Sequence, residues 1–390
     1  MSVDVARARA DTPGTESVAH LNNAGAALPP APVLDAVIEH LRLEAEIGGY
    51  EAAADRADRV EHTYDAIARL IGARPDEIAV VENATRAWDM AFYSLKLQAG
   101  DRILTTNAEY ASNYIPMRQV ADRTGAAVVV VPDDGHGQVD VERLTAMLDE
   151  RVKLVSLVHV SSQGGLVQPA AAVGAACRAA GVPLLLDACQ SIGQLPVDVD
   201  EIGCDMLSAT GRKFLRGPRG TGFLYVRRGL IEDLEPPLLD LQAAQWQPDG
   251  SYVIRPDARR FENWETNVAT KIGLGVAADY ALGVGLEAIR DRVRALAGDL
   301  RARLAERPGV TVHDRGEELG AIVTFTVDGR ETADVVAALR AAGVNTSVSP
   351  ATYARFDFGP RGLTEIVRAS PHYYNDIDDL DRLVDAVERL

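Results

Sequence analysis

The chain has 390 residues, of which 47% are hydrophobic and 25% charged, and its formal net charge is −17 at pH 7. This acidic balance argues against nucleic acid and anionic membranes as partners, because both bind basic surfaces. The sequence has neither the apolar core of a signal peptide near its start nor a run approaching the ~20 apolar residues of a membrane span, which predicts a cytoplasmic protein.

The first half of the chain alternates short apolar runs with helical patterns. A loosely ordered arm (1–19) and a turn-rich segment (20–30) precede two expected helices, at about 32–47 and 55–71. Strands are then expected at 78–81, 102–105, 126–131, 154–160 and 184–186, with helices at 87–95, 112–125, 141–148 and 170–180. This alternation indicates a mainly parallel sheet covered by helices on both faces. Ligands of such sheets bind beyond the carboxyl ends of the strands.

The second half is less regular. A strand is expected at 220–226, followed by an irregular stretch at 235–265 of the kind that is often functional or forms an interface. A linking helix at 266–284 leads to a mixture of helices (286–307, 333–342, 377–389) and strands (321–327, 344–347, 366–369). We therefore predict a large domain of residues 30–265 and a smaller α+β domain of residues 1–29 and 266–390.

The usual metal and nucleotide signatures are absent. Three cysteines, Cys177, Cys189 and Cys204, are too few and wrongly spaced for a disulfide framework or a metal site. The seven histidines show no ligand spacing, and the P-loop, zinc-protease, nucleophile-elbow and dinucleotide-binding motifs are missing. We predict that no metal is bound.

The strongest chemical signal lies in residues 184–222. The apolar strand ends on Asp187, and farther along Lys213, one of only four lysines, stands in a turn rich in glycine and arginine. Taken singly, Asp187 is typical of a turn or a helix cap and Lys213 of a surface. Together they form the pair that pyridoxal phosphate (PLP) needs: an acid that keeps the pyridine nitrogen protonated, and an amine that carries the aldehyde as an imine, which arginine cannot do.

Two other features fit a PLP site without requiring one. Asn83 and Thr85 stand between a strand and a helix, where free backbone N–H groups and a hydroxyl could bind phosphate, although alone this turn is better explained as an ordinary N-cap. Gln190, three residues after Asp187, could bind the ring oxygen of the cofactor or could be a solvated turn amide.

The motifs D-A-C-Q-S (187–191) and T-G-R-K (210–213), with a glycine-rich turn at 217–222, resemble those of the class V aminotransferase and cysteine desulfurase group of fold-type I PLP enzymes. Residues 21–25 and 367–375 (VRASPHYYN) fit the family order, so the similarity covers nearly the whole chain. The resemblance implies the α/β fold of PLP-dependent transferases of fold type I, with a mainly parallel seven-stranded sheet in the large domain and a smaller α+β domain. It also implies a homodimer with active sites at the interface.

The resemblance assigns roles by position. Lys213 is the Schiff-base lysine and then the proton carrier. Asp187 pairs with the pyridinium, Gln190 with the ring hydroxyl, and Tyr110 stacks on the ring, where the family commonly has histidine. The residues implied at the phosphate are Ala84, Thr85, Thr210 and Arg212 (again in place of a histidine). Thr266, or its neighbour Glu265 or Asn267, is implied to reach the phosphate of the partner subunit.

The implied substrate is a small amino acid. Arg368 matches the arginine that holds the substrate α-carboxylate through a bidentate pair. Asn23, Tyr353 and Arg355 are expected to contact the rest of the substrate, with the last two in a loop that varies within the family.

The reaction is less well determined than the cofactor. Cysteine desulfurases take sulfur onto a mobile-loop cysteine upstream of the carboxylate arginine, and residues 343–367 contain no cysteine, which disfavours that activity. The segments 210–226 and 367–375 look most like the C–S lyases of the group, such as ergothioneine-type cysteine S-conjugate lyases, with isopenicillin-epimerase-like enzymes as relatives. Our leading hypothesis is therefore a PLP-dependent C–S lyase that performs β-elimination on an S-substituted cysteine, or its sulfoxide, in small-thiol or sulfur-containing natural-product biosynthesis. An aminotransferase, an epimerase or a decarboxylating or oxidative tailoring enzyme remains open, and a non-catalytic binding protein is least favoured.

Overall fold

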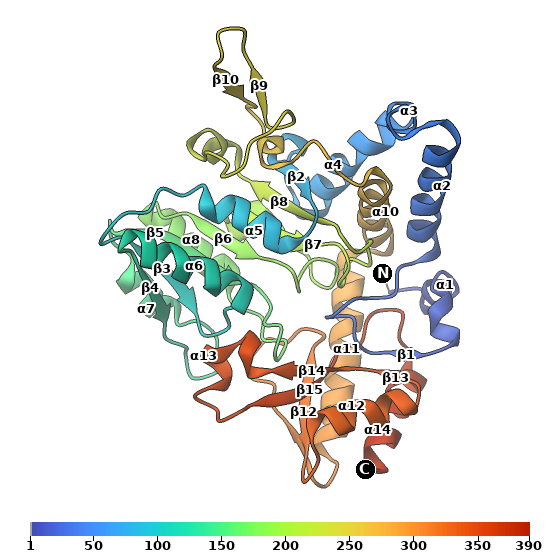
Figure 1. Ribbon diagram of the computed structural model, residues 1–390. Helices are drawn as coiled ribbons and strands as arrows, with labels where there is room; N and C mark the ends of the chain where they lie inside the picture. Colours follow the sequence, from blue (N-terminus) through green and yellow to red (C-terminus); the bar gives the residue numbers. More distant parts are fainter. Residues whose placement is uncertain (1) are drawn as a thin grey trace.

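A seven-stranded sheet forms the centre of the larger domain in the computed structural model, which describes residues 2–390 (Figure 1). Its order is β2-β8-β7-β6-β5-β3-β4, and only β8 runs antiparallel to its neighbours. The mainly parallel seven-stranded sheet is therefore confirmed. The strands are β2 (Ile78–Val81), β3 (Arg102–Thr106), β4 (Ala127–Val131), β5 (Val152–Val158), β6 (Leu184–Asp187), β7 (Met206–Thr210) and β8 (Gly222–Val226).

Alternate residues of each strand enter two separate apolar cores, one on each face of the sheet. In β6, Leu184 and Leu186 belong to the core that contains α4, α8 and α10, whereas Leu185 belongs to the core that contains α5. Because both faces are covered, the strands are continuous apolar runs, as expected for a parallel sheet. The helices of this domain are α2 (Ala31–Ile47), α3 (Gly49–Asp55), α4 (Ala57–Ile71), α5 (Ala84–Tyr93), α6 (Ala111–Thr124), α7 (Val141–Met147), α8 (Ala170–Ala180), α9 (Val199–Ile202) and α10 (Val268–Val284).

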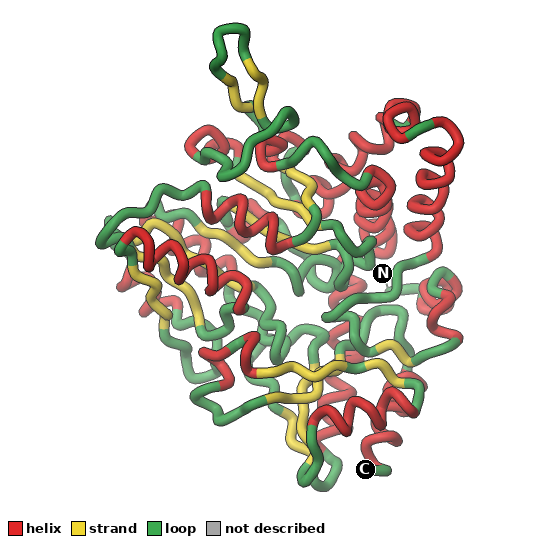
Figure 2. The backbone as a smooth tube through the Cα atoms, in the orientation of Figure 1, coloured by secondary structure: helices red, strands yellow, loops and turns green. Residues whose placement is uncertain are grey.

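The smaller domain contains a four-stranded antiparallel sheet with helices packed against it (Figures 1 and 2). Its order is β11 (Val310–Val312), β12 (Val323–Val327), β15 (Glu365–Ala369) and β14 (Ser347–Pro350). The N-terminal arm joins this domain, since β1 (Ala19–His20) pairs in parallel with β13 (Val344–Asn345). The remaining helices are α1 (Val5–Ala10), α11 (Leu286–Ala305), α12 (Thr332–Ala341), α13 (Arg355–Phe358) and α14 (Ile377–Glu388).

The packing of α10 and α11 involves both apolar cores, and the predicted domain boundary at residue 266 stays a prediction. Leu274 of α10 lies in the core of the large sheet, as does Ile289 in the first half of α11, whereas Leu300 in the second half lies in the core of the small domain. The sequence of an apolar helix does not show which core it joins. In the structure, α10 packs against α2 and α4 of the large domain. Among residues 2–390 no single helix is long and apolar enough to cross a membrane; α10 and α11 meet that criterion only as a pair, bent by 79°.

The stretch expected to be irregular (235–265) contains a hairpin that projects from the body of the molecule (Figures 1 and 2). Strands β9 (Ala244–Trp246) and β10 (Tyr252–Ile254) pair antiparallel. The hairpin exposes large apolar side chains: Trp246 is 78% exposed and Val253 is 59% exposed.

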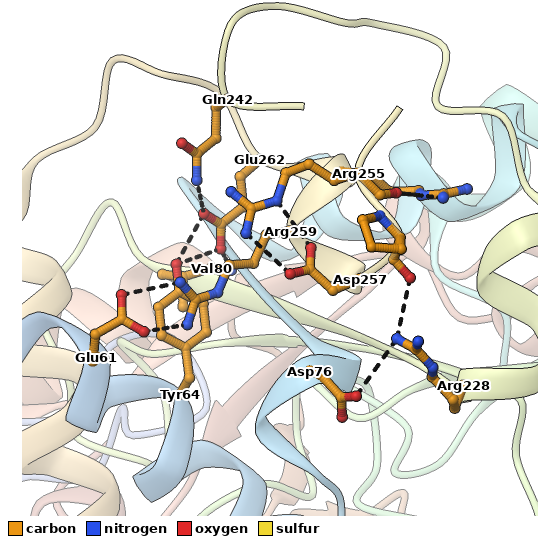
Figure 3. Close-up of polar contacts among 12 residues, drawn as sticks. Glu61, Tyr64, Asp76, Val80, Arg228, Gln242, Arg255, Asp257, Arg259 and Glu262 are labelled. Carbon is orange, nitrogen blue, oxygen red and sulfur yellow. Dashed lines mark hydrogen bonds and ion pairs between the residues drawn. The ribbon is translucent and has the colours of Figure 1, made fainter. Parts of the chain in front are cut away.

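The base of this hairpin is fastened to the sheet by a buried polar cluster centred on Glu262 (Figure 3). The Glu262 carboxylate accepts hydrogen bonds from the Tyr64 hydroxyl at 2.8 and 2.9 Å and from the Val80 backbone N–H at 2.7 Å. It also pairs with the Lys271 amine at 3.6 Å, and both side chains are almost fully buried. Because Val80 belongs to β2, this cluster fixes the strand that leads into the Asn83 turn.

We expect Glu262→Ala to lower the free energy of unfolding by about 3 to 5 kcal/mol, because it leaves the Lys271 cation buried without its partner. Urea denaturation measures the effect. Glu61→Ala provides the matched control: Glu61 pairs with Arg259, but its side chain is 59% exposed, so its removal should cost less than about 1 kcal/mol. Equal losses in the two variants would contradict the structural role given to Glu262.

Candidate active site

Lys213 lies in the turn after β7, beside the carboxyl end of β6. The two strands pair in parallel with Asp187 opposite Ser208, so both chains leave the sheet at the same edge. The Lys213 amine makes no ion pair or hydrogen bond within residues 2–390. Burial lowers the pKa of the Lys213 amine; Cys189 and Asp187 act in the opposite direction, and the positive charges of Arg212 and Arg368 add to the lowering. A larger neutral fraction makes this amine a better nucleophile.

Asp187 provides a buried negative charge at the end of β6. Only 6% of the residue is exposed. Its carboxylate accepts hydrogen bonds from the Cys189 backbone N–H at 2.9 Å and from Asn113 Nδ2 at 2.8 Å. Within residues 2–390 no cationic side chain forms an ion pair with it. A buried carboxylate without a cation fits a protonated ring nitrogen, as the PLP hypothesis requires.

Gln190 is buried and offers one unused hydrogen-bonding atom. Its Nε2 donates to the Ala24 carbonyl at 3.2 Å and to Ser162 Oγ at 3.1 Å. Its buried Oε1 has no hydrogen-bond partner within the described residues 2–390. Because an orphaned buried carbonyl is costly, this atom fits a hydroxyl donor such as that of the PLP ring.

Two tyrosines, one from each domain, come together near this edge. Tyr110 is the N-cap residue of α6, and its ring centroid lies 6.2 Å from that of Tyr353, in the small-domain loop before α13. Burial raises the pKa of the Tyr110 hydroxyl, which keeps it neutral. Phe356 packs edge-on against Tyr114 of α6 at 4.9 Å and holds the same loop in place, whereas Arg355 is exposed.

Arg368 reaches the site from β15 of the small domain. Its Nη1 donates to the Ser162 carbonyl at 3.0 Å, and its buried Nε has no partner within residues 2–390. No carboxylate of the described chain pairs with it, and burial lowers the pKa of the guanidinium to about 10. Such an unpaired cation with a free N–H is suited to a substrate carboxylate.

The start of α5 has the geometry of a phosphate site. The Asn83 side chain caps the helix by accepting from the Arg86 N–H at 2.9 Å, while the N–H groups of Ala84 and Thr85 belong to the first turn and lack intrahelical partners. A Cβ at Gly222 would lie 2.7 Å from the Asn83 carbonyl carbon, so only glycine permits β8 to begin this close to the turn.

The other predicted site residues occupy different environments. Thr210 is buried at the end of β7 and donates to the Thr221 carbonyl at 3.3 Å. Arg212 hydrogen-bonds the Gly25 carbonyl, and burial lowers the pKa of its guanidinium. Thr266 is exposed in the loop before α10, so its predicted role in a partner subunit stays a prediction.

Asn23 is occupied by structural contacts. Its amide donates to the His20 carbonyl at 3.0 Å and to the Ser370 carbonyl at 2.7 Å, and its oxygen accepts from the Tyr374 hydroxyl at 2.5 Å. One amide hydrogen therefore binds within the N-terminal segment, and the other joins that segment to the residues after Arg368. The predicted contact of Asn23 with substrate stays a prediction, but no free amide donor is left for it.

None of the three cysteines presents a ready thiolate. Burial raises the pKa of Cys177 and of Cys204 to about 12. Cys189 lies next to Asp187, and burial together with that negative charge raises the pKa of its thiol well above the ordinary value. All three thiols stay protonated near neutral pH and are poor nucleophiles. Within residues 2–390 no group of three or more His, Cys, Asp or Glu is arranged to hold a metal ion.

Sequence reasoning missed two residues of this site, Glu109 and Asn113. Asn113 lies in the first turn of α6, whereas Glu109 directly precedes the N-cap residue Tyr110 and lies outside the helix. The contact of Asn113 with Asp187 joins positions far apart in the chain, so only the tertiary structure reveals it.

Comparison with known proteins identifies the family. The aminotransferase class V model matches residues 19–383, and the chain belongs to that family. It is 32% identical to the probable cysteine desulfurase 2 of Mycobacterium leprae, over 99% of this chain and 96% of that protein. The apo structure of a cysteine desulfurase from Thermococcus onnurineus NA1 superposes with a TM-score of 0.92 at 26% identity, covering 100% of this chain and 98% of that one. The fold is shared by a C-DES variant with glycine linked to PLP (TM-score 0.87, 22% identity, covering 97% and 98%).

These findings confirm the family, the α/β fold type I and PLP as the cofactor. They overturn the predicted function. The relatives similar in sequence are cysteine desulfurases, the activity that the sequence interpretation disfavoured, and they do not single out a branch of C–S lyases. The assignment to β-elimination on S-substituted cysteines in small-thiol or natural-product biosynthesis is therefore wrong. It gave too much weight to the missing loop cysteine and too little to the similarity along the whole chain.

Proposed function

We propose that the protein removes sulfur from L-cysteine in the manner of a cysteine desulfurase and passes it to a thiol that the chain does not supply. The observation that carries this proposal is the meeting of Arg368, an unpaired, half-buried cation of the small domain, with Lys213 and Asp187 of the large domain. These three groups match an amino acid carboxylate, a PLP aldehyde and a PLP ring nitrogen. The names of the relatives supply the substrate class.

PLP, when bound, supplies an electron sink that acidifies the Cα–H of an attached amino acid. The chain's own groups do the rest. Lys213 holds the cofactor aldehyde and, once displaced by substrate, its amine moves protons between the Cα and neighbouring positions. Arg368 fixes the α-carboxylate with two parallel hydrogen bonds, which sets the orientation of the Cα–H toward the lysine.

The overall reaction balances without an oxidant. The Cβ–S bond of cysteine breaks, a sulfur–sulfur bond forms to the acceptor thiol, and the Cβ takes up a proton. Cysteine and a thiol thus give alanine and a persulfide. The acceptor must come from outside, because residues 343–367 contain no cysteine and the three thiols of the chain are held protonated.

The acceptor assignment has a direct test. We expect the holoenzyme to release alanine from L-cysteine at a rate that rises with added dithiothreitol and then saturates, with sulfide formed in equal amount. Cys189→Ser should retain this rate, because serine preserves the backbone N–H that binds Asp187. Alanine and sulfide are measured by chromatography and colorimetry.

Two outcomes would sink the proposal. Pyruvate and ammonia in place of alanine would show that sulfur leaves by elimination and that the Cα–N bond is then hydrolysed. Loss of sulfur transfer in Cys189→Ser, with PLP still bound, would show that the chain carries its own acceptor.

We further propose that the enzyme is a homodimer in which the hairpin of β9 and β10 meets a second copy. Trp246, Tyr252 and Val253 are each more than half exposed on the hairpin, and apolar surface of this kind marks interfaces. Analytical ultracentrifugation should give a dimer, and Trp246→Arg should weaken it. A monomeric native enzyme would contradict this. The cytoplasmic location expected from the sequence stays a prediction.

A further inference from the structure

A second buried carboxylate, Glu109, lies behind the ring-binding edge of the sheet, and the proposed reaction does not use it. Only 2% of Glu109 is exposed. One carboxylate oxygen accepts from Thr105 Oγ1 at 2.6 Å and Ser156 Oγ at 3.0 Å; the other accepts from the Tyr110 N–H at 2.8 Å and Asn113 Nδ2 at 2.9 Å. No cation pairs with it within residues 2–390. Burying a carboxylate without a cation costs several kcal/mol, so four donors converging on it indicate a specific task.

The Asn113 amide joins Glu109 to the cofactor acid. Its Nδ2 lies 2.9 Å from Glu109 Oε1 and 2.8 Å from Asp187 Oδ2, so each carboxylate receives one of the two amide hydrogens. Turning the amide by 180° would place its carbonyl oxygen against two carboxylates. The orientation is therefore fixed by chemistry, and the 3% exposed Asn113 has no solvent alternative.

The same carboxylate also fixes the aromatic residue. Tyr110 is the N-cap residue of α6, and its backbone N–H is bound by Glu109. Glu109 thus contacts both the residue predicted to cover the ring face and, through Asn113, the acid predicted to meet the ring nitrogen. Asp187 ends β6 and Tyr110 precedes α6, so these two groups would otherwise be positioned independently.

We propose that Glu109 and Asn113 are positioning residues that hold Asp187 against the nitrogen of PLP and Tyr110 against the face of its ring. Asn113 acts directly on Asp187, which without it keeps the Cys189 N–H as its donor. Glu109 acts through Asn113 and through the backbone of Tyr110. This role concerns cofactor binding and does not depend on the substrate or on the sulfur acceptor.

The first test measures PLP itself, without cysteine or thiol. Asn113→Ala should raise the dissociation constant of PLP roughly tenfold or more, the effect of losing a hydrogen bond to a charged group. It should also change the circular dichroism of the bound cofactor at its visible band, which reports ring orientation. Asn375→Ala is the matched control: Asn375 is a fully buried asparagine that donates to the Asp379 carboxylate at 2.9 Å, and its loss should leave both readouts unchanged.

The second test separates the hydrogen bonds of Glu109 from its charge. In Glu109→Gln the amide oxygen can still accept from Tyr110 and Asn113, while the amide nitrogen faces the Thr105 and Ser156 hydroxyls, which can rotate to accept. Glu109→Gln should therefore keep PLP affinity close to that of the native protein, and Glu109→Ala should weaken it. Glu77→Gln, at a buried carboxylate that binds two backbone N–H groups elsewhere, controls for the loss of a buried charge.

Coupling between the two residues decides the proposal. If Glu109 acts through Asn113, Glu109→Ala should weaken PLP binding less in the Asn113→Ala background than in the native protein. The proposal would be overturned if the increases in the PLP dissociation constant caused by the two substitutions simply multiply in the double variant. It would also be overturned if the Asn113→Ala protein binds PLP with native affinity and native circular dichroism. Should Glu109→Ala fail to fold, a large loss of PLP affinity in the folded Glu109→Gln protein would overturn the positioning role, since the hydrogen bonds are retained there.

Discussion

Lys213→Ala is expected to lower the rate of sulfur release from cysteine by roughly 1,000-fold or more, because the chain loses both the amine that holds the cofactor aldehyde and the group that moves the Cα proton. The amine is suited to this role because burial lowers its pKa, despite the opposing effects of Cys189 and Asp187. The variant should still fold, because the amine makes no ion pair in residues 2–390. The measurements are the rate of alanine formation and the visible absorbance of the holoenzyme.

The matched control is Lys96→Ala. Its amine pairs with Glu235 at 3.6 Å, but its side chain is 80% exposed and lies outside the site, so both rate and absorbance should stay native. Borohydride reduction followed by peptide mapping should place the cofactor on Lys213 alone. Cofactor recovered on another of the four lysines, or a native rate in Lys213→Ala, would refute the assignment.

Arg368→Ala is expected to reduce kcat/KM for cysteine roughly 100-fold or more, mainly through KM. The reason is that the α-carboxylate of the bound cysteine would lose the cation proposed to hold it. Arg368 has no acid partner in the described chain and one unused buried N–H, so its removal should not break an internal ion pair. Steady-state kinetics with L-cysteine measure the effect, and PLP content checks that the cofactor remains.

Two companion variants sharpen this prediction. Arg368→Lys keeps the charge but not the planar fork, so it should recover only part of the loss. Arg355→Ala, on the exposed side of α13, should change kcat/KM little if this residue is only solvated. A larger loss in Arg355→Ala than in Arg368→Ala would mean that the carboxylate is held by the loop and not by β15.

The sequence could indicate much of the cofactor site because its parts follow strand ends. The apolar run before Asp187 predicts a buried strand, and acids and amines after neighbouring parallel strands meet at one edge of a sheet. The pairing of Asp187 with Ser208 confirms this geometry. The rest required the fold: Asn113 has the composition of an ordinary helix residue, and nothing local shows that it donates to an acid 74 positions away.

The reaction illustrates the opposite error. A single local feature, the lack of cysteine in residues 343–367, disfavours in the sequence an activity that the whole-chain comparison favours. The structure shows what occupies that loop. Tyr353 approaches Tyr110, and Phe356 packs on Tyr114, so aromatic contacts and not a thiol face the site. Under the proposed function, the missing cysteine bears on the identity of the sulfur acceptor and not on the class of reaction.

The sequence by itself determined the alternation of strands and helices, the acid–amine pair of Asp187 and Lys213, and through them PLP. Local periodicity and chain order are sufficient for these features. Only the tertiary structure decided that α11 crosses between the domains, that Arg368 lacks an acid partner, and that Glu109 reaches Asp187 through Asn113. Each of these three features depends on which groups, distant in the sequence, are buried together. In a buried environment, a missing hydrogen-bond or ion-pair partner has a large energetic effect.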